Sequence, residues 1–299
     1  MIRQKAEILS YKRTGVYHSL TLVAPEIADQ ARPGQFIEVA VPDGREFLLR
    51  RPFSIQQASR RGGWSGTLEF SFVSLGRGTE WLTEVRAHDF LDVIGPLGRP
   101  FLYPRDLTNC LLVGGGYGAA PLYFLAEELR ARGKRVDMII GAKDQERVFK
   151  AVEAKRQAVS ITITTEDGSL GDRGRVTDVL PAMVSRCESQ VVYACGPNPM
   201  LRAVAEYATA HAIPSQVAVE ELMGCGLGVC WTCVVPVIRK DGKGWDNLRS
   251  CLEGPVFPGQ RVWWEKWLGG PSAPIQTPPH GFQMEQATVG RGEPWPETE

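Results

Sequence analysis

Three cysteines gather in one glycine-rich stretch towards the C-terminus, and a fourth follows at a distance. Four residues separate Cys225 from Cys230, two separate Cys230 from Cys233, and Cys251 comes after a gap of 17. This order is typical of a plant-type [2Fe-2S] cluster, in which four thiolates ligate two bridged irons. The glycines between the cysteines favour the same interpretation, because residues without a Cβ let backbone N–H groups approach the cluster sulfurs. We therefore predict that these four cysteines are metal ligands.

Two other interpretations of the cysteines stay open at this point. A structural zinc site usually takes its ligands from two close pairs of cysteines, whereas only Cys230 and Cys233 form such a pair here. Four incidental buried thiols are the second alternative, although incidental thiols do not gather in a glycine-rich loop. The spacing favours the cluster over both.

The length and charge of the chain limit its organisation and its partners. The 299 residues are enough for two or three modest domains with cores of their own. Basic and acidic residues balance at 34 each, so nothing favours nucleic acid or an anionic membrane. The N-terminus lacks the apolar core of a signal peptide, and no apolar run approaches the ~18 residues of a membrane span. Because a thiolate-ligated cluster is assembled in a reducing compartment, we expect a soluble cytoplasmic protein.

Residues 1–104 are expected to form a small antiparallel β-barrel. Short strand-like stretches alternate with turns in this segment, and Leu68, Phe70 and Phe72 would share one strand face opposite Ser71. Regular short strands with glycine and proline between them favour a closed barrel or a sandwich.

A short motif in this segment joins a cation to a hydroxyl group. The stretch from Arg51 to Ser54 reads Arg-Pro-Phe-Ser, and Gly78-Thr79 follows downstream. An arginine with backbone N–H groups near a Gly-Thr turn would hold a pyrophosphate, and the Ser54 hydroxyl would meet the edge of a flavin ring. Taken alone, the motif also fits an edge strand with a surface arginine followed by ordinary turns.

Residues 105–214 change to alternating strands and helices, which predicts a parallel sheet built from βαβ units. The first strand runs into Gly114-Gly115-Gly116-Tyr117-Gly118, directly before a helix expected at 120–132. A strand, a glycine turn and a helix N-terminus form a phosphate-binding arrangement, because the free N–H groups and the helix dipole face the anion. The spacing is not the Gly-x-Gly-x-x-Gly fingerprint, and the same glycines also suit plain tight packing. The further strands are expected at 135–140, 160–164 and 190–195.

The last of these strands runs into a second loop, Cys195-Gly196-Pro197. Ligands of such sheets bind at the carboxyl ends of the strands, which is where both loops fall. We expect Asn198 to cap the following helix, with Pro199 at the first helical position.

The C-terminal part of the chain divides into two segments. Residues 215–270 contain the four cysteines and a strand expected at 234–238. A domain of this size buries little apolar surface, so we expect the cluster to act also as its staple. Residues 271–299 are rich in proline and poor in apolar residues, and we predict that they are disordered.

In this order the motifs resemble the ferredoxin-reductase-like electron-transfer subunits of bacterial NAD-linked dihydroorotate dehydrogenases. The resemblance covers residues 1 to about 268. It implies one FAD in the N-terminal barrel, NAD in the α/β domain and one [2Fe-2S] cluster in the C-terminal domain. The residues that it implies for FAD are Arg51, Pro52, Phe53, Ser54, Ser71, Phe72, Val73, Gly78 and Thr79. For NAD they are Gly114, Gly115, Gly116, Gly118, Gly196 and Pro197.

Two positions have a special place within this resemblance, the Phe72-Val73 pair and Cys195. The family usually has a Tyr-Arg pair where this chain has Phe72-Val73, which leaves the middle contact to FAD dependent on backbone groups. Cys195 is similar to the thiol beside the nicotinamide in such reductases, where it would orient the ring. The alternative is an ordinary cysteine at the end of a strand.

The implied activity is that of an oxidoreductase subunit, and the chemistry agrees with it. Nicotinamide transfers two electrons as hydride and a cluster transfers one, so a flavin is needed between them. In the family, a partner catalytic subunit oxidises dihydroorotate on its own flavin, and electrons pass through the cluster and FAD to NAD+ in pyrimidine (UMP) biosynthesis. We expect a heterotetramer of two copies of each chain, with the exposed side of the cluster facing the partner.

Alternatives from other classes share part of these features. Related subunits occur in sulfhydrogenases and in ferredoxin:NADP transhydrogenases, and the identity of the electron donor depends on the other chain. A non-enzymatic alternative is a nucleotide-binding module stapled by zinc. NAD and NADP are not distinguished either, because Lys143 would suit a 2′-phosphate and Asp144 a 2′-hydroxyl.

Overall fold

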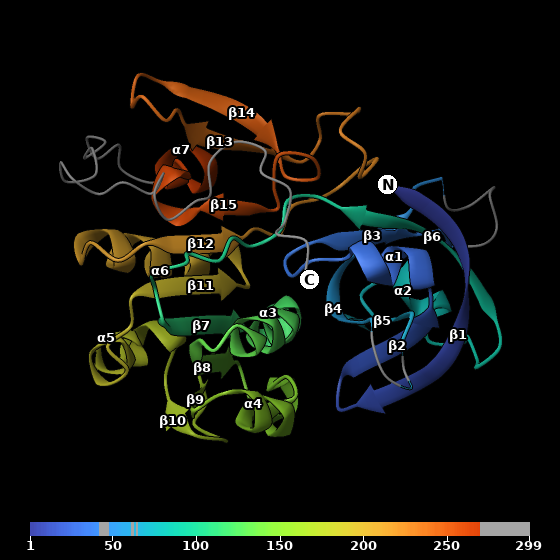
Figure 1. Cartoon of the computed structure of the whole chain (residues 1–299), viewed down its shortest axis with the longest axis horizontal. Coiled ribbons are helices and arrows are strands. Elements are labelled where there is room, and N and C mark those ends of the chain that lie inside the picture. The colour runs from blue at the N-terminus through green and yellow to red at the C-terminus, as the bar shows by residue number, and fades with distance from the viewer. Residues whose placement is uncertain (42–47, 61–62, 64, 270–299) are drawn as a thin grey trace.

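A computed structural model of the protein describes residues 1–41, 48–60, 63 and 65–269 (Figure 1). The tail that the sequence predicts to be disordered, 271–299, lies outside the described residues. None of the helices in the described part of the chain is both long enough and apolar enough to cross a membrane.

Six antiparallel strands close into a barrel in the order β1-β2-β5-β4-β3-β6, as the sequence predicts. Alternate side chains of the strands fill its interior, and Leu20, Ile37 and Phe70 are fully buried there. Two short helices, α1 (Pro25–Gln30) and α2 (Arg77–Trp81), interrupt the strands. The strands are β1 (Ile2–Thr14), β2 (Tyr17–Val23), β3 (Phe36–Val39), β4 (Arg51–Ser59), β5 (Thr67–Val73) and β6 (Phe90–Leu97).

The second layer is a seven-stranded sheet in the order β10-β9-β8-β7-β11-β12-β15. All neighbours in it are parallel except β12 and β15, which confirms the predicted parallel sheet. Its strands are β7 (Asn109–Gly115), β8 (Arg135–Ala142), β9 (Ser160–Thr165), β10 (Asp172–Arg173), β11 (Val191–Cys195), β12 (Ser215–Ala218) and β15 (Val256–Pro258).

Helices cover both faces of this sheet. Leu112 of β7 packs with α3 on one face, and its neighbours Leu111 and Val113 pack with α5 and α6 on the other. The arrowheads in Figure 1 show that the carboxyl ends of β7 and β11 point towards the barrel, so the loops that follow them lie between the two layers. The helical segments are η1 (Gly116–Ala119), α3 (Ala120–Ala131), η2 (Gln145–Arg147), α4 (Ala151–Gln157), α5 (Val176–Arg186) and α6 (Asn198–Ala210).

The C-terminal segment is tied to this sheet rather than separate from it. A two-stranded ribbon, β13 (Val234–Ile238) with β14 (Trp245–Arg249), lies beside the sheet, followed by η3 (Gly259–Arg261) and α7 (Trp264–Leu268). Strands β12 and β15, which fall within residues 215–270, pair with each other at the edge of the sheet. The strand pairing shows that the C-terminal segment shares its core with the seven-stranded sheet. The bounds of the domains stay a prediction.

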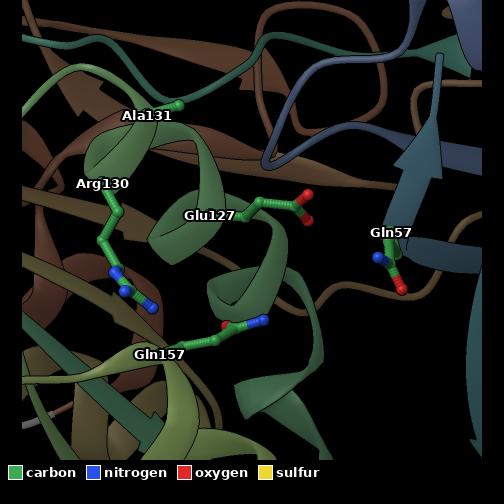
Figure 2. Close-up of a pocket in the computed structure, with 5 residues that line it drawn as sticks. All are labelled: Gln57, Glu127, Arg130, Ala131 and Gln157. Carbon is green, nitrogen blue, oxygen red and sulfur yellow. The ribbon is translucent and has the colours of Figure 1, made fainter. Parts of the chain in front are cut away.

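Polar contacts join the barrel to the sheet layer. The Tyr17 hydroxyl donates to the carbonyl oxygen of Arg147 at 2.6 Å, and Lys150 Nζ lies 2.5 Å from Glu69 Oε1. Beside this seam lies a polar cavity of about 500 Å³. Figure 2 shows the residues that line it, which come from β4, from α3 and from the end of α4. No predicted site residue is among those that line it, so the chemistry lies elsewhere.

Candidate functional site

The first two predicted ligands lie at the surface of a loop, 220–233, here called the cluster loop. Backbone N–H groups point at their sulfurs: Leu227 and Val229 each donate to Cys225 Sγ at 3.3 Å. Cys225 N donates to Cys230 Sγ at 3.4 Å, and the Thr232 hydroxyl donates to the same sulfur at 3.2 Å. Led by this hydroxyl, the hydrogen bonds lower the pKa of Cys230 to about 6. The loop thus stabilises the thiolate of Cys230, which is the form that ligates a metal.

The other two predicted ligands are buried behind this pair. Cys233 is 1% and Cys251 2% exposed, and they pack with Phe36 and Leu97 of the barrel. Burial, and then the adjacent Cys233, raise the pKa of Cys251 to about 12. The four thiols therefore fall into an outer pair and an inner pair.

This donor set fits a [2Fe-2S] cluster. Such a cluster takes four cysteines for its two irons. Cys225, Cys230 and Cys233 of the cluster loop and Cys251 of the turn after β14 meet that demand. Gly226 and Gly228 have φ angles of +67° and +80°, which a residue with a Cβ rarely adopts. Within the described residues, no group of three or more His, Cys, Asp or Glu side chains forms a site for a single metal ion.

The predicted flavin and nicotinamide residues meet in a cavity of about 250 Å³ between the barrel and the sheet. Some predicted residues do not line the cavity, namely Gly78, residues 114–116, and residues 196 and 197. Each of these segments is next in the sequence to a residue that does line it. The predicted residues that do line it are Arg51, Pro52, Phe53, Ser54, Ser71, Phe72, Val73, Thr79, Gly118 and Cys195.

Arg51 lies against Gly78 in the first turn of α2, although 26 residues separate them in the chain. The Gly-Thr turn predicted from the sequence is thus the start of this helix. A Cβ on Gly78 would come 2.8 Å from Arg51 Nε, so glycine lets the guanidinium approach this helical turn without shifting. The Thr79 hydroxyl accepts from the backbone N–H groups of Leu75 at 2.9 Å and Gly76 at 3.2 Å, so it orders the turn itself. A fixed cation over a turn fits the pyrophosphate of a dinucleotide.

The remaining barrel residues of the cavity divide into packing and polar groups. Phe53 stacks on Phe70 with ring centroids 4.7 Å apart, and both Phe53 and Phe72 belong to the barrel core. Ser54 is exposed. The Ser71 hydroxyl donates to Gln56 Oε1 at 2.5 Å, a contact that the sequence does not predict.

The two glycine loops of the sheet layer pack against each other. A Cβ on Gly118 would come 2.6 Å from Gly196 Cα, and one on Gly115 would come 2.7 Å from Met200 Sδ. Close packing is therefore a sufficient reason for these two glycines. It also brings the N-terminal end of α3 next to the loop that follows β11, as a dinucleotide site requires.

The predictions that Asn198 caps α6 and that Pro199 is its first residue are both wrong by one position. Pro197 occupies the cap position, Asn198 is the first helical residue, and its Nδ2 donates to the carbonyl oxygen of Glu220 at 3.0 Å. The Asn198 side chain thus connects the start of α6 to the start of the cluster loop. The proline before it already fixes the entry of the chain into the helix.

Cys195 ends β11 at the cavity and is 3% exposed. Burial first, and then the nearby Glu220, raise the pKa of its thiol well above the usual value. A neutral thiol here can pack against a ring but does not act as a thiolate nucleophile. Sequence reasoning missed other residues of the lining, among them Phe36, Glu220, Glu221 and Met223. The available signal for the last three was that they lie shortly before the first cluster cysteine.

Comparisons with known proteins find matches for the segments in which the cysteines and the glycine loops lie. Residues 220–263 match the iron-sulfur cluster binding domain of dihydroorotate dehydrogenase B, and residues 112–206 match the oxidoreductase NAD-binding domain. The dihydroorotate dehydrogenase B (NAD(+)) electron transfer subunit of Desulforamulus reducens is 36% identical, over 81% of this chain and 90% of that protein. The subunit of the same name from Geobacillus kaustophilus is 39% identical, over 82% and 92%.

A solved structure described as an NADH-dependent reduced ferredoxin-NADP oxidoreductase has the same fold. It superposes with a TM-score of 0.75 and 26% identity, over 89% of this chain and 92% of that one. Close relatives and fold agree, and the chain belongs to the family of dihydroorotate dehydrogenase B (NAD(+)) electron transfer subunits.

Proposed function

We propose that this chain is an oxidoreductase subunit that passes electrons from a dihydroorotate-oxidising partner through a [2Fe-2S] cluster and FAD to NAD+, in pyrimidine biosynthesis. One observation carries the proposal. Phe36 packs against Cys233 and Cys251 on one side and lines the cavity with Arg51 and Cys195 on the other. Met223 has the same two sets of contacts, so Phe36 and Met223 lie between the cluster cysteines and the cavity, and electrons would travel a short distance between them.

The three cofactors supply one-electron transfer, its conversion to two-electron transfer, and hydride acceptance. The residues of the chain bind and orient them. Cys225, Cys230, Cys233 and Cys251 would hold the cluster, and Arg51 over the Gly78-Thr79 turn would hold the pyrophosphate of FAD.

On the nucleotide side, Gly114, Gly115, Gly116 and Gly118 would shape the loop before α3, with Gly196 and Pro197 packed beside it. Cys195 would hold the nicotinamide ring against the flavin by packing. Its buried, neutral thiol suits that positioning role, because an uncharged group does not compete with hydride transfer.

The partner subunit would dock on the apolar rim of the cluster loop. Leu227, Val229 and Trp231 are 37%, 76% and 55% exposed around the outer pair of thiols, and Leu222 is 83% exposed nearby. Exposed apolar side chains gathered in this way commonly mark an interface. We propose that two copies of this chain and two of the partner form the complete enzyme.

The test separates the subunit from its complex. Alone, the cofactor-loaded chain should pass electrons from NADH to ferricyanide and leave dihydroorotate untouched. Mixed with a dihydroorotate-oxidising subunit, it should confer NAD+ reduction, and a Cys225→Ser chain should lose that coupling while a Cys187→Ser chain keeps it. Oxidation of dihydroorotate by the isolated chain at the rate of the complex would contradict the proposal.

A further inference from the structure

A buried carboxyl group of the barrel lies against the cluster loop. Glu38 is 1% exposed, and neither of its carboxyl oxygens has a hydrogen-bond partner among the described residues. Buried ionisable groups are costly unless they are paired, so native proteins rarely keep an unpaired one without a use.

The position of Glu38 on β3 places its side chain against the cluster loop. Side chains two residues apart on a strand share a face, so Glu38 points the same way as Phe36, which packs on Cys233 and Cys251. Its carboxyl group meets Gly226, the residue after Cys225, and a Cβ on Gly226 would overlap Glu38 Oε1. Glycine at this position therefore admits the carboxyl group into the loop.

Glu38 also lies next to the cavity that would hold FAD. Across the strand pair, Glu38 is in register with Pro52 of β4, which lines the cavity. Burial raises the pKa of Glu38 to about 7, against the opposing effect of the charges of Arg50 and Arg51, and Arg50 donates its hydrogen bonds to Asp92. The carboxyl group thus lies between the two proposed electron-transfer sites without a direct ion pair.

We propose that Glu38 lowers the reduction potential of the cluster by placing a carboxylate against the cluster loop. The inference rests on the proposed function, since it requires the four cysteines to hold a [2Fe-2S] cluster. Reduction adds a negative charge to the cluster, and a carboxylate nearby in a water-poor interior opposes it. The consequence is a cluster that donates electrons more readily to the flavin, in the direction of NAD+ reduction.

The test is a redox titration of the full chain, loaded with FAD and cluster, at a mildly alkaline pH. Glu38→Gln removes the charge and keeps the shape. At a fixed potential it should raise the ratio of reduced to oxidised cluster about tenfold, as read from the electron paramagnetic resonance signal. Tenfold corresponds to about 59 mV towards positive values for one electron. The shift should persist at high salt, because buried charges are weakly screened.

Two matched variants make the result specific. Glu7→Gln makes the same change at an exposed barrel carboxylate paired with His88, and it should leave the potential unchanged. Glu38→Asp keeps the charge and should shift the potential less than Glu38→Gln. An unshifted potential in Glu38→Gln, an equal shift in Glu7→Gln, or loss of the cluster from Glu38→Gln would overturn the inference. Absence of a cluster signal in the unaltered chain would instead overturn the proposed function, and this inference with it.

Discussion

The cluster loop and the cavity are two sites built in opposite ways. The cluster loop and the turn after β14 supply all four thiols within 225–251, and backbone N–H groups of the same loop point at the sulfurs. The cavity takes its lining from the barrel, from Tyr117 and Gly118, from the end of β11, and from residues 218–221 with Met223 and Pro255. The first site therefore depends mainly on local spacing, and the second depends on how the barrel docks against the sheet.

The largest expected effect tests whether the cluster loop stands on its own. Replacing any one of Cys225, Cys230, Cys233 or Cys251 by Ser should remove most of the iron and of the cluster absorbance, because each thiolate would hold one of only four ligand positions. FAD content should fall much less than iron content, since Arg51 and the other barrel residues of the cavity lie outside the cluster loop, although Glu220, Glu221 and Met223 of that loop also line it. Iron analysis and visible spectra measure both.

Cys110→Ser and Cys187→Ser are the matched controls, because both thiols are buried outside the two sites. If Cys251→Ser kept two irons per chain, the fourth ligand would be wrongly assigned.

The next effect tests the cavity from its barrel side. Arg51→Ala should weaken FAD binding by one to two decades, since loss of a charge-assisted pair costs roughly 1.5–3 kcal/mol. The cluster should keep its iron. Flavin retained after dialysis gives the measurement, and Arg13→Ala, at an exposed arginine of β1, gives the control. Full retention of FAD by Arg51→Ala would refute the role of Arg51.

A third variant tests the sheet side of the same cavity. Gly118→Ala would place a Cβ 2.6 Å from Gly196 Cα. Such overpacking typically costs about 1–3 kcal/mol, and it should push the two loops apart and raise the KM for NADH. Gly63→Ala, where a Cβ meets nothing within 4 Å, should change neither stability nor KM. An unchanged KM in Gly118→Ala would show that NADH binding does not depend on this contact.

The smallest effect concerns the barrel on which the cavity depends. Hydrogen bonds from Arg3 first, and then from Arg50, hold the pKa of Asp92 at about 2, below the usual value of an aspartate carboxyl group. A depressed carboxyl pKa adds stability that is fully present above the unfolded pKa and is lost as the pH falls towards the folded one.

Asp92→Asn should therefore cost about 1 kcal/mol at neutral pH, a value reduced for partial solvent exposure. It should also flatten the loss of stability between about pH 4 and pH 2. Urea unfolding at a series of pH values measures both. The same pH slope in the variant and in the unaltered protein would assign the acid sensitivity to other groups.

Much of the fold follows from the sequence because its signals are local. The alternation of Leu68, Phe70 and Phe72 predicts a barrel strand. The observed strand β5 contains all three and extends one residue further at each end. Pro121 and Gly133 bracket α3 as expected. The participation of β12 and β15 in one edge of the sheet was not predicted, because strands of four and three residues carry too little pattern to show their partners.

The sequence by itself determined the four cysteines, their glycines and the order of the three segments. These depend on spacing, on the φ angles that glycine permits and on alternation, all of which act between neighbours in the chain. Only the tertiary structure decided that Phe36 joins the cavity to Cys233 and Cys251, and that Glu38 meets Gly226. The reason is that β3 and the cluster loop are almost 190 residues apart, and a contact over that separation exists only once the barrel has closed and docked on the sheet.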